Sequence, residues 1–255
     1  MGNHAQTHLF LWRACALVVG PGIDSKMHSH FAMQLTVGLD QPFRARLSEE
    51  APWTETDSAI FVPNQLHQID GSGMLAHLFV DLPQHGGAGA GALVAGYARL
   101  PEFDTVRTAL QEACSGTLDL DGAADATKVW LDCALTTSLT PTAFDPRIAQ
   151  TLAWISTQEN QAISGTELAA RVHLSVSRFT HLFRQQTGLS LTRYLLWTRL
   201  LAAVDAVAHG ANTTAAAHTA GFADLAHMSR TFRNTFGVMP SELQRMTIAF
   251  KRERA

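Results

Sequence analysis

An internal repeat in the second half of the chain limits most strongly how it can fold. The strings LFRQQTGLS and TFRNTFGVM lie 49 positions apart, so Phe183 corresponds to Phe232 and Gly188 to Gly237. Each copy follows a short helix-forming segment and a tight turn, and each ends in a glycine, a residue that commonly terminates helices. Two helices joined by a tight turn form a helix-turn-helix, so the repeat predicts two such units.

The second helix of each unit should present a face of small and basic side chains. In the first copy the apolar stripe expected to face the core consists of Val176, Phe179, Leu182 and Phe183, and the opposite stripe of Ser177, Thr180, His181 and Arg184. In the second copy the inward residues are Leu225, Met228 and Phe232, and the outward residues are Ala226, Ser229, Arg230 and Arg233.

These two faces have the chemistry that a DNA major groove requires. The groove is about 12 Å wide, so small residues permit close approach, and Arg, Ser, Thr and His can reach base edges. A long helix is expected between the copies, over residues 191–209, with no proline or glycine inside it. At ~1.5 Å per residue it spans ~28 Å, close to the ~34 Å between successive major-groove faces. Ordinary solvated helix faces are the alternative interpretation.

The charge distribution favours a polyanionic partner for the second half only. Residues 1–146 carry 7 Lys and Arg against 16 Asp and Glu, a net charge of −9, whereas residues 147–255 carry 12 against 6, a net charge of +6. The hydrophobic content of 46% supports a buried core, and the low charged content of 16% excludes a wholly disordered chain. The apolar segment 9–20 is too short to span a bilayer and has no basic segment before it, so we expect a cytoplasmic protein without a membrane partner.

The first half has the pattern of short strands followed by helices. Apolar runs separated by Gly, Pro and Asp occur at residues 9–19, 32–37, 59–62 and 75–80. After the glycine-rich stretch 86–91 the periodicity becomes helical, over residues 103–114 and 123–139. We therefore predict an α+β chain in three parts: a β-barrel over residues 1–85, a helical region over 86–140 that packs on the barrel or forms a homodimer, and an all-α domain over 141–255.

Helix boundaries in the last part are marked by capping residues. The expected N-caps are Asp145, Ser164 (with Glu167 in a capping box), Ser175, Thr213 and Asp224. Residues 138–144 form the expected linker, and the basic tail, Arg245, Lys251, Arg252 and Arg254, is expected to be solvated.

From about Asp145 to Met246 the chain resembles the DNA-binding region of the AraC/XylS family of transcription regulators. The matching strings are ELAARVHLSVSRFTHLFRQQTGLSLTRYL, TRLLAA and AGFADLAHMSRTFRNTFGVMPSEL. The resemblance places base-reading residues at Ser177, Thr180, His181, Leu225, Ala226, Ser229 and Arg230. Leu225 and Ala226 stand where the family often has polar residues, so contact with thymine methyl groups is their expected role.

The same resemblance implies a cupin-type barrel that senses a small molecule or mediates dimerisation. His28 and His30 are two residues apart, so on a strand they share a face, which His67 on a facing strand could join. Three histidines are the ligand set of several cupin metal sites. Because Gln34 stands where a carboxylate is expected, we assign no metal or cofactor. The candidate effector-binding residues are His28, His30, Gln34, Phe61 and His67.

The sequence therefore predicts a sequence-specific regulator rather than an enzyme. Its expected partners are double-stranded DNA, a small-molecule effector and, for an activator, RNA polymerase. A cupin-type metal-dependent enzyme with an accessory helical domain is one alternative, and a module whose basic half binds a protein is another.

Overall fold

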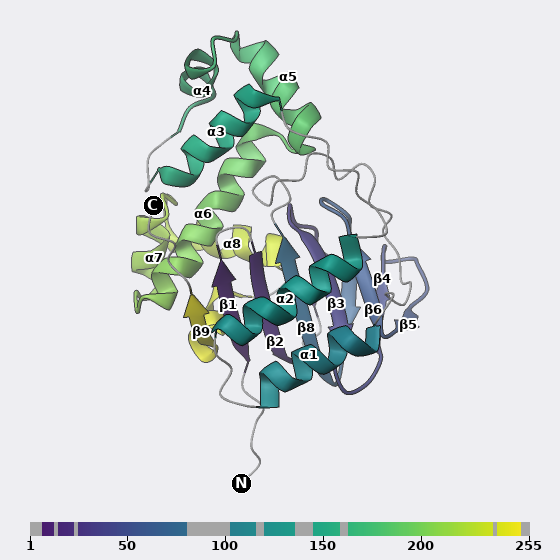
Figure 1. Ribbon diagram of the computed structural model, residues 1–255. Helices are drawn as coiled ribbons and strands as arrows, with labels where there is room; N and C mark the ends of the chain where they lie inside the picture. The colour runs from purple at the N-terminus through teal and green to yellow at the C-terminus, as the bar shows by residue number, and fades with distance from the viewer. Residues whose placement is uncertain are drawn as a thin grey trace.

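The computed structural model describes residues 7–12, 15–22, 25–80, 103–115, 120–135, 145–158, 163–236 and 239–250. They form an α+β fold with a sheet-rich first half and a helical second half, as the sequence predicted (Figure 1). The glycine-rich stretch 86–91, the linker 138–144 and residues 251–255 lie outside the described residues. The division of the chain at residues 85 and 140 stays a prediction.

The described strands form two sheets, and all of them except β9 come from the first half of the chain. The larger has the order β6-β3-β8-β2-β1-β9, and the smaller has the order β5-β4-β7. The strands are β1 (His8–Trp12), β2 (Cys15–Pro21), β3 (Met33–Gly38), β4 (Phe43–Arg46), β5 (Thr54–Thr56), β6 (Ser58–Phe61), β7 (Gln68–Asp70), β8 (Met74–Val80) and β9 (Thr247–Phe250). A core that includes Phe43, Phe61 and Ile69 joins the two sheets.

The apolar run at residues 9–19 forms two strands. β1 and β2 pair antiparallel, with Trp12 opposite Cys15 and His8 opposite Val19. Folding the run back on itself satisfies its backbone hydrogen bonds within one sheet, so both halves of the run can be buried together.

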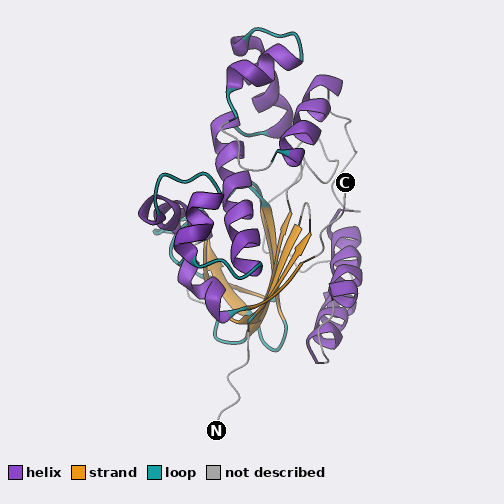
Figure 2. Cartoon of the chain, turned by 90° about the vertical axis from the view of Figure 1, so that its left-hand side faces the viewer, coloured by secondary structure: helices purple, strands orange, loops and turns teal. Residues whose placement is uncertain are grey.

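Helices cover both faces of the larger sheet (Figure 2). On one face α1 (Phe103–Ser115) and α2 (Leu120–Leu135) pack through a core that includes Trp130 and, from the sheet, Phe10. On the other face the C-terminal helices pack through a core that includes Trp197 and, from the sheet, Leu9. Neighbouring residues of a strand point to opposite faces, which is why Phe10 and Leu9 belong to different cores. The apolar faces of α1 and α2 thus pack on the sheet, one of the two roles expected for them.

The helices of the C-terminal half are α3 (Pro146–Thr157), α4 (Gly165–Arg171), α5 (Val176–Thr187), α6 (Leu191–Ala208), α7 (Thr213–Thr219), α8 (Leu225–Phe236) and the 3-10 helix η2 (Pro240–Arg245). One short helix and one longer helix directly precede α6 in the sequence, and a second such pair follows it. The first pair is α4 and α5, and the second is α7 and α8. Gly188 ends α5 with a φ of 74°, the left-handed conformation that glycine adopts without strain. None of the described helices has the length and apolar character needed to cross a bilayer.

The capping predictions are accurate except at one helix. Side chains of Asp145, Ser164 and Ser175 accept hydrogen bonds from backbone N–H groups at the starts of α3, α4 and α5, and Asp224 accepts one from His227 at the start of α8. The cap of α7 is Asn212 rather than Thr213, because the Asn212 side chain accepts from the N–H of Ala215.

The last strand returns to the first. β9 lies parallel to β1, with His8 opposite Thr247 and Leu11 opposite Phe250. The backbone N–H of Thr247 also donates to the carbonyl oxygen of Thr7 at 2.9 Å. The segment that follows the second helix-turn-helix therefore forms an edge of the N-terminal sheet.

Candidate DNA-binding surface and apolar pocket

Helix α5 presents the outward face predicted for it. Phe179 and Phe183 are fully buried in a core with α3, α4 and the start of α6. On the opposite side Ser177, His181 and Arg184 are exposed and Thr180 is half-buried. The Thr180 hydroxyl donates to the carbonyl oxygens of Val176 and Ser177, at 3.0 and 3.1 Å.

Val176 was predicted to face the core, and this is wrong. Its side chain is 44% exposed. As the first residue of α5, it lies one turn before Phe179, where the helix meets its core. It therefore extends the exposed face next to Ser177.

Helix α8 repeats the arrangement. Met228 and Phe232 are buried, and Asp224 caps the helix start. The outward residues are Ala226, Arg230 and Arg233, which are exposed, and Ser229, which is half-buried. Leu225 is half-buried and packs against the core shared with the sheet.

The arginines of these faces are available to a partner. Within the described residues, Arg184, Arg230 and Arg233 take part in no ion pair. Between the two faces runs α6, which is 18 residues long, or ~27 Å at ~1.5 Å per residue. Buried Tyr194, Trp197 and Leu200 anchor α6 along its length, so it can act as a firm connection between the two units.

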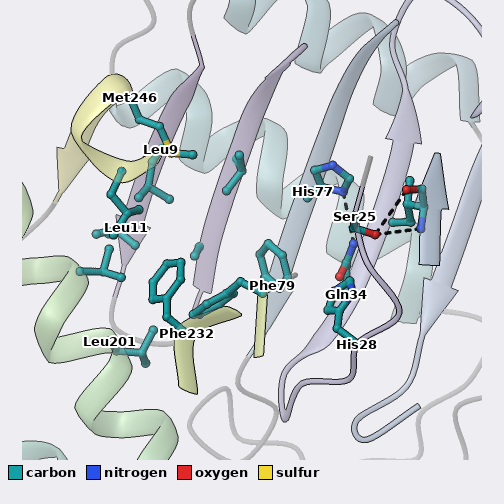
Figure 3. A pocket seen from close by; sticks show the side chains of 16 residues that line it. Leu9, Leu11, Ser25, His28, Gln34, His77, Phe79, Leu201, Phe232 and Met246 are labelled. Atoms are coloured by element: carbon teal, nitrogen blue, oxygen red, sulfur yellow. Dashed lines mark hydrogen bonds between the residues drawn. The ribbon is translucent and has the colours of Figure 1, made fainter. Parts of the chain in front are cut away.

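A cavity of about 110 Å³ lies between the larger sheet and the C-terminal helices (Figure 3). Most of its wall is apolar and comes from both halves of the chain: Leu9, Leu11, Ala16, Val18, Ile69 and Phe79 from the first, and Leu201, Val204, Phe232, Phe236, Leu243 and Met246 from the second. One end is polar and is formed by Ser25, His28, Gln34 and His77. Phe232 and Phe236 belong to α8, so the helix with the second outward face also forms part of the cavity wall.

A buried histidine cluster lies at this polar end. His28 forms an isolated β-bridge with His67, and their ring centroids are 4.3 Å apart. His30 Nε2 lies 2.6 Å from Gln34 Oε1, and His67 Nε2 lies 3.2 Å from the same oxygen. Ligand atoms of the three histidines all lie within 4.8 Å of one another. The predicted meeting of His67 with His28 and His30 is confirmed.

The cluster favours neutral imidazoles. Burial, with repulsion from His28 as a smaller cause, lowers the pKa of His30 to about 4. Desolvation, with smaller repulsions from His28 and His30, lowers the pKa of His77 to about 4. Burial also lowers the pKa of His28, and lowers the pKa of His67 well below its ordinary value. At neutral pH each ring therefore has one protonated and one unprotonated nitrogen.

The candidate effector-binding residues do not all reach the cavity. His28 and Gln34 line it, whereas Phe61 lies outside its wall, stacked on His67 with centroids 4.1 Å apart. Their role as ligand contacts stays a prediction. Sequence reasoning missed Thr36, which shares the Gln34 face of β3 and could have been found by its i, i+2 spacing. It also missed the wall from the C-terminal helices, for which no local signal exists.

Comparisons with known proteins assign the C-terminal region. Residues 168–246 match a family described as a helix-turn-helix domain. Over 101 residues the chain is 36% identical to the HTH-type transcriptional activator RhaS of Klebsiella pneumoniae and 35% identical to that of Escherichia fergusonii. Each match covers 39% of this chain and 36% of the relative, so the likeness to these curated relatives extends over little more than a third of their length.

The whole fold is similar to that of ToxT from Vibrio cholerae. One ToxT crystal structure superposes with a TM-score of 0.61 at 9% identity and covers 96% of this chain and 99% of ToxT. ToxT with a bound unsaturated fatty acid superposes with a TM-score of 0.57 at 12% identity, over 92% and 96% of the two chains. These identities establish a shared fold only. The helix-turn-helix match and the RhaS relatives agree with the resemblance of the C-terminal region to the DNA-binding region of the AraC/XylS family.

Proposed function

We propose that the protein is a sequence-specific, double-stranded DNA-binding transcription regulator that responds to a small, mainly apolar effector. The observation that carries the DNA-binding part is the pair of matching faces on α5 and α8. Both faces are small or basic, both lie opposite buried aromatic residues, and neither contains an acidic side chain. Such faces suit the phosphate-lined major groove better than a neutral protein surface.

The base-reading residues proposed for this function are those of the two outward faces, with half-buried Leu225 beside the second face. They are Ser177, Thr180, His181 and Arg184 on α5, and Leu225, Ala226, Ser229, Arg230 and Arg233 on α8. Arginine is the residue most often used for bidentate contacts to guanine, whereas Leu225 and Ala226 offer only apolar contact.

The cavity supports the effector part of the proposal. Its volume of about 110 Å³ is of the order of the ~150 Å³ cavity that takes up benzene in another protein. A small apolar molecule, or the end of a longer one, would contact Leu11 and Phe79, and a polar group on it would meet His28, Gln34 or His77. ToxT, which shares the fold, has been crystallised with an unsaturated fatty acid, a ligand of the same amphipathic kind.

The wall of the cavity suggests how the effector acts. Phe232 and Phe236 face it from α8, and Arg230 lies on the opposite side of the same helix. An occupant that fits only one placement of α8 shifts the population toward that placement and changes DNA affinity. This mechanism needs no catalysis, so we propose a non-enzymatic role in the cytoplasm. Contact with RNA polymerase, if the protein activates, and homodimerisation belong to the same proposal.

The deciding experiment is a binding selection of the full chain on random duplex DNA. We expect a defined motif recognised by one chain over about two helical turns, with affinity that falls steeply as salt rises. Recovery of no motif, with equal affinity for all duplexes, would exclude sequence-specific regulation and favour the protein-binding alternative.

A further inference from the structure

The two histidines at the polar end of the cavity hold their protons on opposite nitrogens. His28 donates its Nδ1–H to the carbonyl oxygen of Lys26 at 2.7 Å, so the Nε2 of its neutral ring has a lone pair. The amide nitrogen of Gln34 lies 3.2 Å from His77 Nδ1. An amide nitrogen can only donate, so His77 Nδ1 accepts, and the proton of the neutral His77 ring is on Nε2.

Neither of these Nε2 atoms has a partner. Among the described residues, the hydrogen bonds of His28 and His77 all involve Nδ1 of the ring or the backbone. The two Nε2 atoms are also not enclosed, because the completely enclosed, unpaired polar side-chain atoms of the described residues belong to other side chains. Both rings line the cavity, at its polar end (Figure 3). This end therefore offers a ligand one acceptor and one donor.

The polar end carries no charge. Within the described part of the chain, no Lys, Arg, Asp or Glu lines the cavity. The Ser25 hydroxyl is already used, because it donates to the carbonyl oxygen of Ile69 at 3.3 Å and accepts from the N–H of Ile69 at 3.0 Å. Burial lowers the pKa of His28, and lowers the pKa of His77 to about 4, so both rings are neutral near pH 7. A carboxylate bound here would lose its hydration without gaining a cation, which is unfavourable.

We propose that the cavity binds a small apolar ring or short chain that bears one neutral hydroxyl group, such as a phenol or an aryl alcohol, and rejects carboxylates. The hydroxyl donates to His28 Nε2 and accepts from His77 Nε2, because a hydroxyl has one proton and two lone pairs. The apolar part contacts Leu11 and Phe79. This inference rests on the proposed effector role of the cavity. It gives the ligand a different head group from that of the unsaturated fatty acid crystallised with ToxT.

The preference for a hydroxyl does not depend on which way the Gln34 amide is turned. With the amide reversed, its oxygen would accept from His77 Nδ1, and His77 Nε2 would have a lone pair like His28 Nε2. A hydroxyl can donate to either lone pair, whereas a carboxylate has no proton to donate. Both arrangements therefore favour the hydroxyl and disfavour the anion.

The test is calorimetric titration of the full chain with three single-ring probes at neutral pH. The probes are phenol, fluorobenzene and benzoate. Fluorobenzene has nearly the shape of phenol but cannot donate a hydrogen bond, so phenol should bind roughly tenfold more tightly. Benzoate is ionised at this pH and should show no binding. This comparison uses the wild type alone, so it does not depend on the folding of any variant.

Three variants locate the probes within the protein. His28→Leu removes the acceptor, so it should bind phenol no more tightly than fluorobenzene. Ala16→Leu fills part of the cavity and should weaken both neutral probes alike, because Ala16 borders that space. His218→Ala removes an exposed histidine of α7 and should leave all three affinities unchanged.

Two kinds of result would overturn the proposal. Equal affinities for phenol and fluorobenzene, or binding of benzoate as tight as that of phenol, would show that the polar end does not select a hydroxyl, while an apolar effector site would stand. Absence of binding by every probe would remove the effector role of the cavity as well. The selection on random duplex DNA is independent of both results, so it tests the regulator function separately.

Discussion

The ring of Phe236 on α8 packs edge-on against Phe79 on β8, with centroids 5.8 Å apart and an interplanar angle of 86°. Both rings line the cavity. This contact directly links α8, the helix proposed to read DNA, with the sheet that forms part of the proposed effector site. Edge-to-face pairs of this kind contribute about 0.5–1.5 kcal/mol beyond their buried area.

The first prediction concerns the cavity. Benzene should raise the unfolding temperature of the wild type, because the cavity is largely apolar and of suitable size. Ala16→Leu should abolish this shift, because the larger side chain fills space that Ala16 borders, at a stability cost of about 1–3 kcal/mol. Leu66→Ala, at an apolar residue that is 46% exposed, is the control and should keep the shift. An equal shift in Ala16→Leu would place the benzene site elsewhere.

The second prediction concerns Arg230. Its replacement by alanine should weaken binding to the selected motif by about 1–3 kcal/mol and relax specificity at one base pair. Arg171→Ala removes an equal charge from α4, at an exposed side chain that pairs with Glu167 at 3.3 Å, and should leave base preference unchanged. Quantitative binding to single-base variants of the motif measures both. If Arg230→Ala weakens binding to every sequence alike, Arg230 contacts phosphate instead.

The third prediction concerns Val176. Because this side chain is exposed beside the reading face, Val176→Ala should change stability by no more than about 0.5 kcal/mol, whereas Phe179→Ala should cost about 3–5 kcal/mol. Val176→Glu should weaken DNA binding by placing a negative charge near phosphates. Ala149→Glu adds the same charge at an exposed position of α3 and serves as the control. Undiminished DNA affinity in Val176→Glu would show that the start of α5 lies away from the groove.

The fourth prediction concerns the acid stability of the protein. Histidines held neutral by the fold have folded pKa values below the unfolded value of 6.5, so the unfolded chain binds more protons as the pH falls. The stability that these neutral histidines contribute is therefore fully present above about pH 6.5. It is lost progressively as the pH falls from 6.5 to about 4, by up to about 1.4 kcal/mol for each unit of difference between the folded and unfolded pKa.

The variant His77→Asn isolates one member of the cluster. Asparagine can accept the hydrogen bonds that Thr36 and Gln34 direct at His77 Nδ1, but it does not titrate. Urea unfolding of His77→Asn should show a smaller loss of stability between pH 6.5 and 4 than urea unfolding of the wild type. An identical pH profile in the two proteins would show that His77 is not held neutral by the fold.

Local patterns were sufficient to predict the helices of the second half. Asp145, Ser164 and Ser175 cap their helices through bonds that span at most three residues, so the information lies within each segment. The matching faces of α5 and α8 follow from helical periodicity for the same reason. The prediction for Val176 was wrong because helical periodicity indicates which side of a helix faces the core but not how far the core extends along that side.

Features that depend on distant segments could not be predicted. Strand β9 exists because Thr247–Phe250 meets His8–Trp12, and nothing near residue 247 indicates that partner. The cavity likewise needs Leu9 and Phe236 to meet across two halves of the chain. The histidine cluster was partly predictable, since the spacing of His28 and His30 is local. Its connection to His77 through Gln34 and Thr36 depends on the pairing of β3 and β8, which sets Thr36 opposite His77.

The parallel pairing of β9 with β1 means that the chain cannot be separated into a sensor piece and a DNA-binding piece by one cut. Cleavage within residues 136–144 would leave the sensor fragment without a strand that only the other fragment supplies, and the bare edge of β1 would be open to pairing with other chains. Isolated halves of this protein are therefore poor substitutes for the intact molecule. A fusion partner placed directly after Phe250 would lie next to the edge of the larger sheet, because β9 ends there.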